Sequence, residues 1–197
     1  MVFIAAKGHS LSLLFTSERI QSTVAFALRH PDNPGRQKFV LKSTMNSSLY
    51  SGTDYEKKAL NEFCERWLKD TFWPFKEFEL SLKIPGTFLI FAETSVGSAE
   101  DFTGLALGRV MGGVSELFFI YTRPDLRGNG LGRQLLLDFE AHSRASLQAQ
   151  SVMLEVRPSN DSAIRLYEKS AYKKVGQRKR YYKDGEDALI FEKVLGS

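Results

Sequence analysis

A glycine-rich run is the strongest chemical signal in this 197-residue chain. It follows an apolar stretch at 117–121, precedes an amphipathic pattern, and reads Arg127, Gly128, Asn129, Gly130, Leu131, Gly132. Glycines let successive backbone N–H groups converge on one point, and the N-terminus of a helix adds partial positive charge. With the guanidinium of Arg127 beside them, these groups predict a site for a phosphate.

The spacing of the run narrows the choice of ligand. A P-loop needs Lys and then Ser or Thr after its last glycine, whereas Gly132 is followed by Arg133 and Gln134. A dinucleotide fingerprint needs G-x-G-x-x-G after the first strand, whereas this run is G-x-G-x-G after the third predicted strand. A plain glycine turn before a helix remains as an alternative.

A carboxylate stands in the next predicted strand, at 152–156. Glu155 is flanked by Leu154 and Val156 in an otherwise apolar stretch. Burying a carboxylate is costly unless it has a partner or a chemical task. Glu155 is therefore either a candidate proton acceptor or one half of an ion pair with a nearby Arg or Lys.

The elements that must position these residues follow from hydrophobic periodicity and turn residues. Helices are expected at 54–69, 75–82, 131–147 and 161–169, the last capped by Ser159 or Asn160, and strands at 87–92, 104–110, 115–121, 152–156, 174–181 and 188–194. Alternation of strands and helices in the middle predicts an α/β fold (α+β mixed), in which helices flank both faces of a mixed sheet.

The glycine-rich run resembles the Q/R-x-x-G-x-G/A motif of the GNAT acetyltransferases, with Arg127, Gly130 and Gly132 at the defining positions. The stretches 154–160 and 163–168 resemble the next segment of that family, at matching order and distance. The resemblance covers about 54–195. It is nearest to the ribosomal-protein-alanine acetyltransferases (RimI-type), because 178–182 and 186–188 look like their final hairpin and 72–75 stands where they have a Pro/Trp pair.

This resemblance implies the GNAT fold, a central mixed and mostly antiparallel sheet, and acetyl-CoA as cofactor. It implies transfer of the acetyl group to a primary amine, above all the α-amino group of a protein N-terminus, by direct attack on the thioester. The cofactor-binding residues that it implies are Ile120, Tyr121, Thr122, Arg127, Gly128, Asn129, Gly130, Leu131, Gly132, Arg133, Asn160 and Tyr167.

By the same resemblance, Glu155 is the general base and Tyr167 the general acid. Phe75, Tyr181 and Tyr182 join Glu155 in binding the acceptor. Backbone N–H groups at 120–122, where the family strand carries a bulge, would polarise the thioester carbonyl. Each of two residues has an alternative role that stays open. For Tyr167 the alternative is a core tyrosine. For Asn160 it is a helix N-cap, a role that is compatible with cofactor contact.

Two departures from the family pattern stand out. The family usually has Leu-Gly-Phe after its tyrosine-bearing helix, but this chain has Ser170, Ala171 and Tyr172, so that helix must end without its usual glycine. The first strand expected before residue 54 is not recognisable.

Charge counts by segment argue against nucleic acid as a partner. Residues 1–44 hold six basic and two acidic residues, so the whole net charge of +4 lies there, and the remaining 21 basic and 21 acidic residues cancel. Six basic residues stand in the run 173–183, yet Asp184, Glu186 and Asp187 follow at once. A non-catalytic ribosome- or RNA-binding module using this run is the alternative from another class.

The domain that the resemblance covers is expected at 53–197, after an N-terminal extension at 1–52. That extension is a targeting segment, a structured addition, or the result of a start placed upstream of Met45.

The rest of the composition excludes several classes of protein. Cys64 is the single cysteine, so no internal disulfide or cysteine zinc cluster can form, and a structural role fits its apolar helix position better than an acetyl-enzyme. His9, His30 and His142 lack ligand spacing, so no metal is expected.

No run approaches the roughly 18 apolar residues that cross a bilayer. We therefore expect a cytoplasmic protein, as a monomer or weak dimer. The family resemblance implies that it acts on a protein or peptide N-terminus, for example of a ribosomal protein. The next candidate acceptor is a small-molecule amine.

Overall fold

A computed structural model describes residues 20–27, 40–69, 71, 73–93 and 102–196. Its centre is an eight-stranded sheet with the order β1-β2-β3-β4-β5-β6-β8-β7. The strands are β1 (Ile20–Ala27), β2 (Val40–Leu49), β3 (Thr87–Glu93), β4 (Phe102–Met111), β5 (Val114–Thr122), β6 (Ser151–Val156), β7 (Lys173–Arg178) and β8 (Ala188–Val194). Only β5 and β6 pair in parallel, which confirms a mixed and mostly antiparallel sheet.

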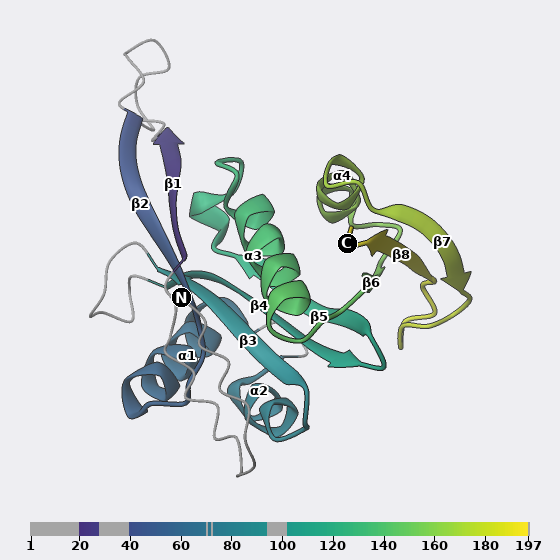
Figure 1. Cartoon of the computed structure of the whole chain (residues 1–197), viewed down its shortest axis with the longest axis horizontal. Helices are drawn as coiled ribbons and strands as arrows, with labels where there is room; N and C mark the ends of the chain where they lie inside the picture. Colours follow the sequence, from purple (N-terminus) through teal and green to yellow (C-terminus); the bar gives the residue numbers. More distant parts are fainter. Residues whose placement is uncertain (1–19, 28–39, 70, 72, 94–101, 197) are drawn as a thin grey trace, which may run out of the picture.

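Within the described residues, four α-helices cover the two faces of this sheet (Figure 1). They are α1 (Asp54–Trp67), α2 (Phe75–Leu82), α3 (Leu131–Ala145) and α4 (Asp161–Lys169). One apolar core joins α3 and α4 to the sheet, and a second core joins α1 and α2 to the opposite face. The predicted fold class, with helices on both faces, is confirmed. Among the described residues, no helix is both long and apolar enough to reach across a bilayer.

Several element ends differ from those that the sequence predicts. The helix α3 ends at Ala145 rather than at residue 147, although Leu147 still packs against the core and so extends the apolar periodicity. The strand β7 ends at Arg178 rather than at residue 181, because Arg180 takes a left-handed conformation with φ 53°. At α3, apolar periodicity reports burial, and burial continues past the end of the helix.

A strand that the sequence did not reveal lies before α1. The backbone of β2 pairs antiparallel with β3, with Asn46 opposite Glu93 and Leu49 opposite Ile90, and β1 pairs with β2. The buried Ser47 hydroxyl donates to Asp138 of α3 over 2.7 Å. The division of the chain at residue 52 stays a prediction, as does the origin of residues 1–52, of which 1–19 and 28–39 lie outside the described residues.

The second core holds the single cysteine. Cys64 is 4% exposed, and burial raises the pKa of its thiol to about 12. A thiol with so high a pKa is a poor nucleophile at neutral pH. This environment agrees with the structural role expected for Cys64.

A β-bulge in β5 aims neighbouring side chains at different cores. Leu107 lies opposite Phe119, while Gly108 lies opposite Leu117, so Phe118 is the extra residue. Leu117 therefore packs in the core under α3, and Phe119 packs against the core under α1 and α2. On a regular strand these two residues would face the same side.

Candidate active site

The sheet opens in its middle, between β5 and β6. These strands pair only where 114–117 of β5 meet 151–154 of β6. Beyond that point β5 stays paired with β4, and β6 stays paired with β8. Within the described residues, 118–122 of β5 thus have no strand beside them on the β6 side.

Two amides of β5 face this opening. The backbone amide of Arg123 donates to the carbonyl of Thr103, near the start of β4, over 2.9 Å. Because N–H groups of successive strand residues point to alternate edges, the amides of Ile120 and Thr122 point away from β4. They lie where the sequence places donors for a carbonyl oxygen.

The bulge itself lies earlier than predicted, at Phe118 rather than within 120–122. Its partner Gly108 explains the position. A Cβ on Gly108 would lie 2.3 Å from the carbonyl oxygen of Glu116 and 2.4 Å from the ring of Phe139. Only glycine leaves room for the irregular backbone at this point.

The glycine-rich run follows β5 and a short 3-10 turn, Pro124–Leu126, and leads into α3. Gly128 and Gly130 have φ of 81° and 86°, and Gly130 is the N-cap of α3 without a side chain to cap it. The first amides of α3 therefore lack a side-chain acceptor from the N-cap. A Cβ on Gly128 or Gly130 would meet nothing within 4 Å, so the space beside the run is open.

The remaining residues of the run hold its shape. The side-chain Nδ2 of Asn129 donates to the carbonyls of Leu126 and Arg127, at 3.2 and 3.4 Å. Arg127 is exposed, and its Nε donates to the carbonyl of Thr122 over 3.2 Å.

The first turn of α3 is anchored at the same place. Leu131 is buried, Arg133 is exposed, and Gly132 sits against Thr122 and Leu166. The structure thus brings the whole run, 127–133, next to the open end of β5. A helix start without a capping side chain, open space beside the glycines and a guanidinium fit the diphosphate of coenzyme A.

A cavity of about 540 Å³ lies at the opening, beside β6. It is lined by Trp73, Ser81, Ile84, Thr87, Arg109, Glu116, Leu117, Phe118, Met153, Leu154, Glu155, Arg178, Tyr181, Tyr182 and Ile190. Side chains of successive strand residues alternate between faces, so Glu155 faces away from the α3 core that holds Leu154 and Val156. The carboxylate of Glu155 thus lies in a cavity whose lining mixes apolar, aromatic and charged residues.

The carboxylate of Glu155 has partners from the β7 side. Its Oε1 accepts from Nε of Arg178 over 2.8 Å, and a hydrogen bond to Glu155 raises the pKa of Tyr181. The ion pair that the sequence left open as an alternative is therefore present. It does not remove Glu155 from the cavity, because a quarter of its side chain is exposed there.

The predicted aromatic residues divide between cavity and core. Tyr181 and Tyr182 line the cavity, as predicted. Phe75 packs against the core under α1 and α2 and is not among the lining residues, whereas Trp73 is. Phe72 lies outside the described residues.

Tyr167 lies on the α4 side. It is 5% exposed, within 6.3 Å of the rings of Tyr172 and Phe191, and burial raises its pKa well above the usual value. The hydroxyl is thus protonated throughout the neutral range. Asn160 is the N-cap of α4, accepting from the amide of Ala163 over 3.2 Å. Its contact with a cofactor stays a prediction.

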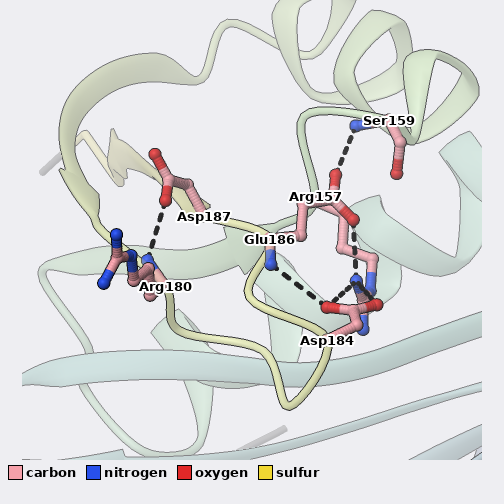
Figure 2. Close-up of polar contacts among 6 residues, drawn as sticks. All are labelled: Arg157, Ser159, Arg180, Asp184, Glu186 and Asp187. Carbon is pink, nitrogen blue, oxygen red and sulfur yellow. Dashed lines mark hydrogen bonds and ion pairs between the residues drawn. The ribbon is translucent and has the colours of Figure 1, made fainter.

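A salt-bridge cluster fastens the loop between β7 and β8 to the turn after β6, as Figure 2 shows. Nη1 of Arg157 lies 2.8 Å from Asp184 and 2.7 Å from Glu186, and Glu186 also accepts from the amide of Ser159. The guanidinium of Arg157 covers the ring of Tyr182 at 3.7 Å. The cluster therefore fixes one wall of the cavity.

The same cluster shows which basic residue the acidic residues after the run 173–183 pair with. Asp184 and Glu186 pair with Arg157, which lies outside the run 173–183. They do not offset the lysines of β7 as directly as the sequence count implied.

Sequence reasoning missed Arg178, Arg109 and Trp73 as cavity residues. Arg178 and Trp73 stand in stretches that the family resemblance covers, but nothing local marks either as facing Glu155 or the cavity. Arg109 lies opposite Glu116 in the register of β4 and β5, and their side chains are 3.5 Å apart. Only the pairing of strands could have revealed that contact.

Known proteins resemble this chain in sequence and in fold. Residues 53–172 match the model of the "Acetyltransferase (GNAT) family". The N-alpha-acetyltransferase RimI of Mycobacterium tuberculosis is 33% identical over 126 residues, which are 63% of this chain and 77% of that protein. The [ribosomal protein bS18]-alanine N-acetyltransferase of Salmonella typhimurium is 36% identical over 100 residues, 47% of this chain and 65% of that protein.

Among solved structures, the ribosomal-protein-S18-alanine N-acetyltransferase of Escherichia coli aligns with a TM-score of 0.62 and 25% identity. The alignment covers 77% of this chain and 95% of that one.

Proposed function

This chain belongs to the GNAT acetyltransferase family and uses acetyl-CoA to acetylate an amine, and we propose that the amine is the α-amino group of a protein N-terminus. A ribosomal protein with a small first residue, such as alanine, is the proposed natural acceptor. The observation that carries this proposal is the carboxylate of Glu155 in a cavity at the opening between β5 and β6.

The names of relatives support this choice of acceptor. The Salmonella typhimurium and Escherichia coli proteins are named for acetylation of an alanine of a ribosomal protein. With a ribosomal protein as acceptor, the enzyme would work in the cytoplasm.

The chemistry of the acceptor also supports the proposal. An α-amino group has a pKa of about 7.7 to 8.0, against about 10.4 for a lysine side chain. An α-amine is therefore far more often neutral at pH 7. One carboxylate is sufficient to accept the proton of such a nucleophile, and Glu155 provides a carboxylate in the described cavity.

Acetyl-CoA, when bound, supplies the acetyl thioester. The amides of the run 127–132 and the start of α3 would hold its diphosphate, with Arg127 and Asn160 nearby. The amides of Ile120 and Thr122 would donate to the thioester carbonyl oxygen and stabilise the charge that develops there.

Proton transfers fall to two side chains. Glu155 would accept a proton from the attacking amine, with the bound thioester supplying the acetyl group and the sulfur as leaving group. Tyr167, protonated at neutral pH, donates a proton to the departing sulfur.

A panel of acceptors tests the proposal. Release of free thiol from acetyl-CoA is measured with a peptide that begins with alanine, and with the same peptide acetylated at its N-terminus and carrying one internal lysine. Spermidine and an aminoglycoside represent small amines. We expect release with the free α-amine alone. Release with spermidine or the aminoglycoside but not with the peptide would assign the enzyme to small-molecule amines instead.

A further inference from the structure

Arg178 reaches Glu155 across a strand. It stands on the sheet edge in β7, opposite Ala188 of β8, and its side chain crosses to the carboxylate on β6. Its guanidinium lies 2.8 Å from Glu155 through Nε and 5.6 Å from the ring centroid of Tyr181. The candidate base therefore has a cationic partner before any acceptor arrives.

No other described group of the cavity brings a positive charge to Glu155, although Tyr181 also hydrogen-bonds to that carboxylate. Arg109 pairs with Glu116 at 3.5 Å, while Tyr181 and Tyr182 are neutral at pH 7, because both pKa values are raised. Arg178 is thus the cation that faces Glu155 among the residues lining the cavity.

A carboxylate base creates a difficulty for an amine substrate. At pH 7 most of an α-amine is ammonium, and a nearby carboxylate favours the charged form further. An ammonium paired with Glu155 would bind well but could not attack the thioester. Tight binding of the protonated acceptor would then lower kcat, the rate at which the bound complex reacts.

We propose that Arg178 keeps the bound acceptor amine neutral, by occupying one oxygen of Glu155 and by repelling an ammonium at the other. The inference rests on the proposed role of Glu155. With two hydrogen bonds to one carboxylate, the amine nitrogen lies roughly 4 to 6 Å from the guanidinium. The extra proton of an arriving ammonium goes to solvent before the amine attacks. Glu155 then accepts a second proton from the same nitrogen as the nitrogen–carbon bond forms.

The expected size of the effect is modest, because 59% of the Arg178 side chain is exposed. Like charges about 5 Å apart near a protein surface repel, and solvent screening reduces that repulsion. We expect the neutral amine to be favoured about tenfold over the ammonium. An arginine suits the task because its guanidinium does not lose its own proton beside a second cation.

The test compares kcat and KM of Arg178→Gln with those of the unaltered chain, from pH 5.5 to 9, using a peptide that begins with alanine. Below pH 8 we expect KM to fall and kcat to fall about tenfold, so that kcat/KM changes much less. The acid limb of the kcat profile should move to higher pH. Arg178→Lys, which keeps a cation, should restore the profile in large part.

The matched control is Lys179→Gln, which removes the same charge from an exposed neighbour. It should leave both constants and the pH profile unchanged. If Arg178→Gln lowers kcat equally at every pH, or leaves the acid limb where it was, the inference is wrong. Failure of the unaltered enzyme to acetylate the α-amine would instead contradict the proposed function. Melting temperatures of all variants show whether each one folds.

Discussion

At the scale of single residues, the two proposed proton carriers lie in different environments. Glu155 lines the cavity at the opening of the sheet, whereas Tyr167 is buried against the α3 core. Glu155→Gln and Tyr167→Phe should each lower the rate of thiol release with the alanine peptide by roughly 10²- to 10⁴-fold. Both changes nearly preserve side-chain volume, so the melting temperature should move little. Unchanged turnover in either variant would remove the assigned role of that residue.

A half-buried histidine gives a prediction for stability. His142 of α3 packs 4.6 Å from the ring of Phe88, and burial lowers its pKa below the usual 6.5. The unfolded chain therefore binds this proton more readily than the folded one, so stability is lost as pH falls below about 6.5. His142→Gln should reduce this loss, measured as the free energy of unfolding in urea at pH 5.5 and 7.5. An equal pH dependence in both proteins would contradict the assignment.

Local sequence was informative for residues whose neighbours in the chain define their environment. Glu155 stands out because apolar residues flank it. The glycine run stands out because the spacing of its glycines can be read directly from the sequence. The roles of Arg178 and Arg109 depend on which strands lie side by side. The order β6-β8-β7 brings Arg178 to Glu155 from 23 positions further along the chain, and no local pattern records that.

At the scale of elements, the end of α4 departs from its family pattern. Ala171 takes the left-handed conformation, φ 68°, that glycine normally supplies after a helix, and it is exposed. Ala171→Gly should therefore raise the free energy of unfolding by about 1 kcal/mol. The control is Ala141→Gly, in an exposed turn inside α3, which should lower it by about 0.5 to 1 kcal/mol. A loss of stability in both would show that Ala171 is unstrained.

The Arg157 cluster gives a prediction for the loop between β7 and β8. Arg157→Ala releases Asp184, Glu186 and the ring of Tyr182 together. The KM for the acceptor peptide should rise severalfold, while the KM for acetyl-CoA changes little, because the loop forms a wall of the acceptor cavity. Arg165→Ala, an exposed arginine on α4, serves as the control. Equal effects on both substrates would mean that the cluster supports the whole opening.

At the scale of the whole molecule, the sequence predicted the layers better than the edge of the sheet. From α1 to β8 each α-helix and strand has its expected type, and apolar periodicity marks most of them. The strand β2 reads VLKSTMNSSL, which is largely polar, and it is recognised only through its pairing with β3. Membership of an acetyltransferase family favours an enzyme over the RNA-binding module that the basic run left open.

The central claim is that the glycine-rich run and the Glu155 cavity meet at one opening, so that one molecule can occupy both. Titration calorimetry with an alanine peptide joined through its α-amine and an acetyl group to the sulfur of coenzyme A tests this directly. We predict that the conjugate binds at least about 100-fold more tightly than coenzyme A or the peptide alone. A conjugate that binds no more tightly than coenzyme A would contradict the account.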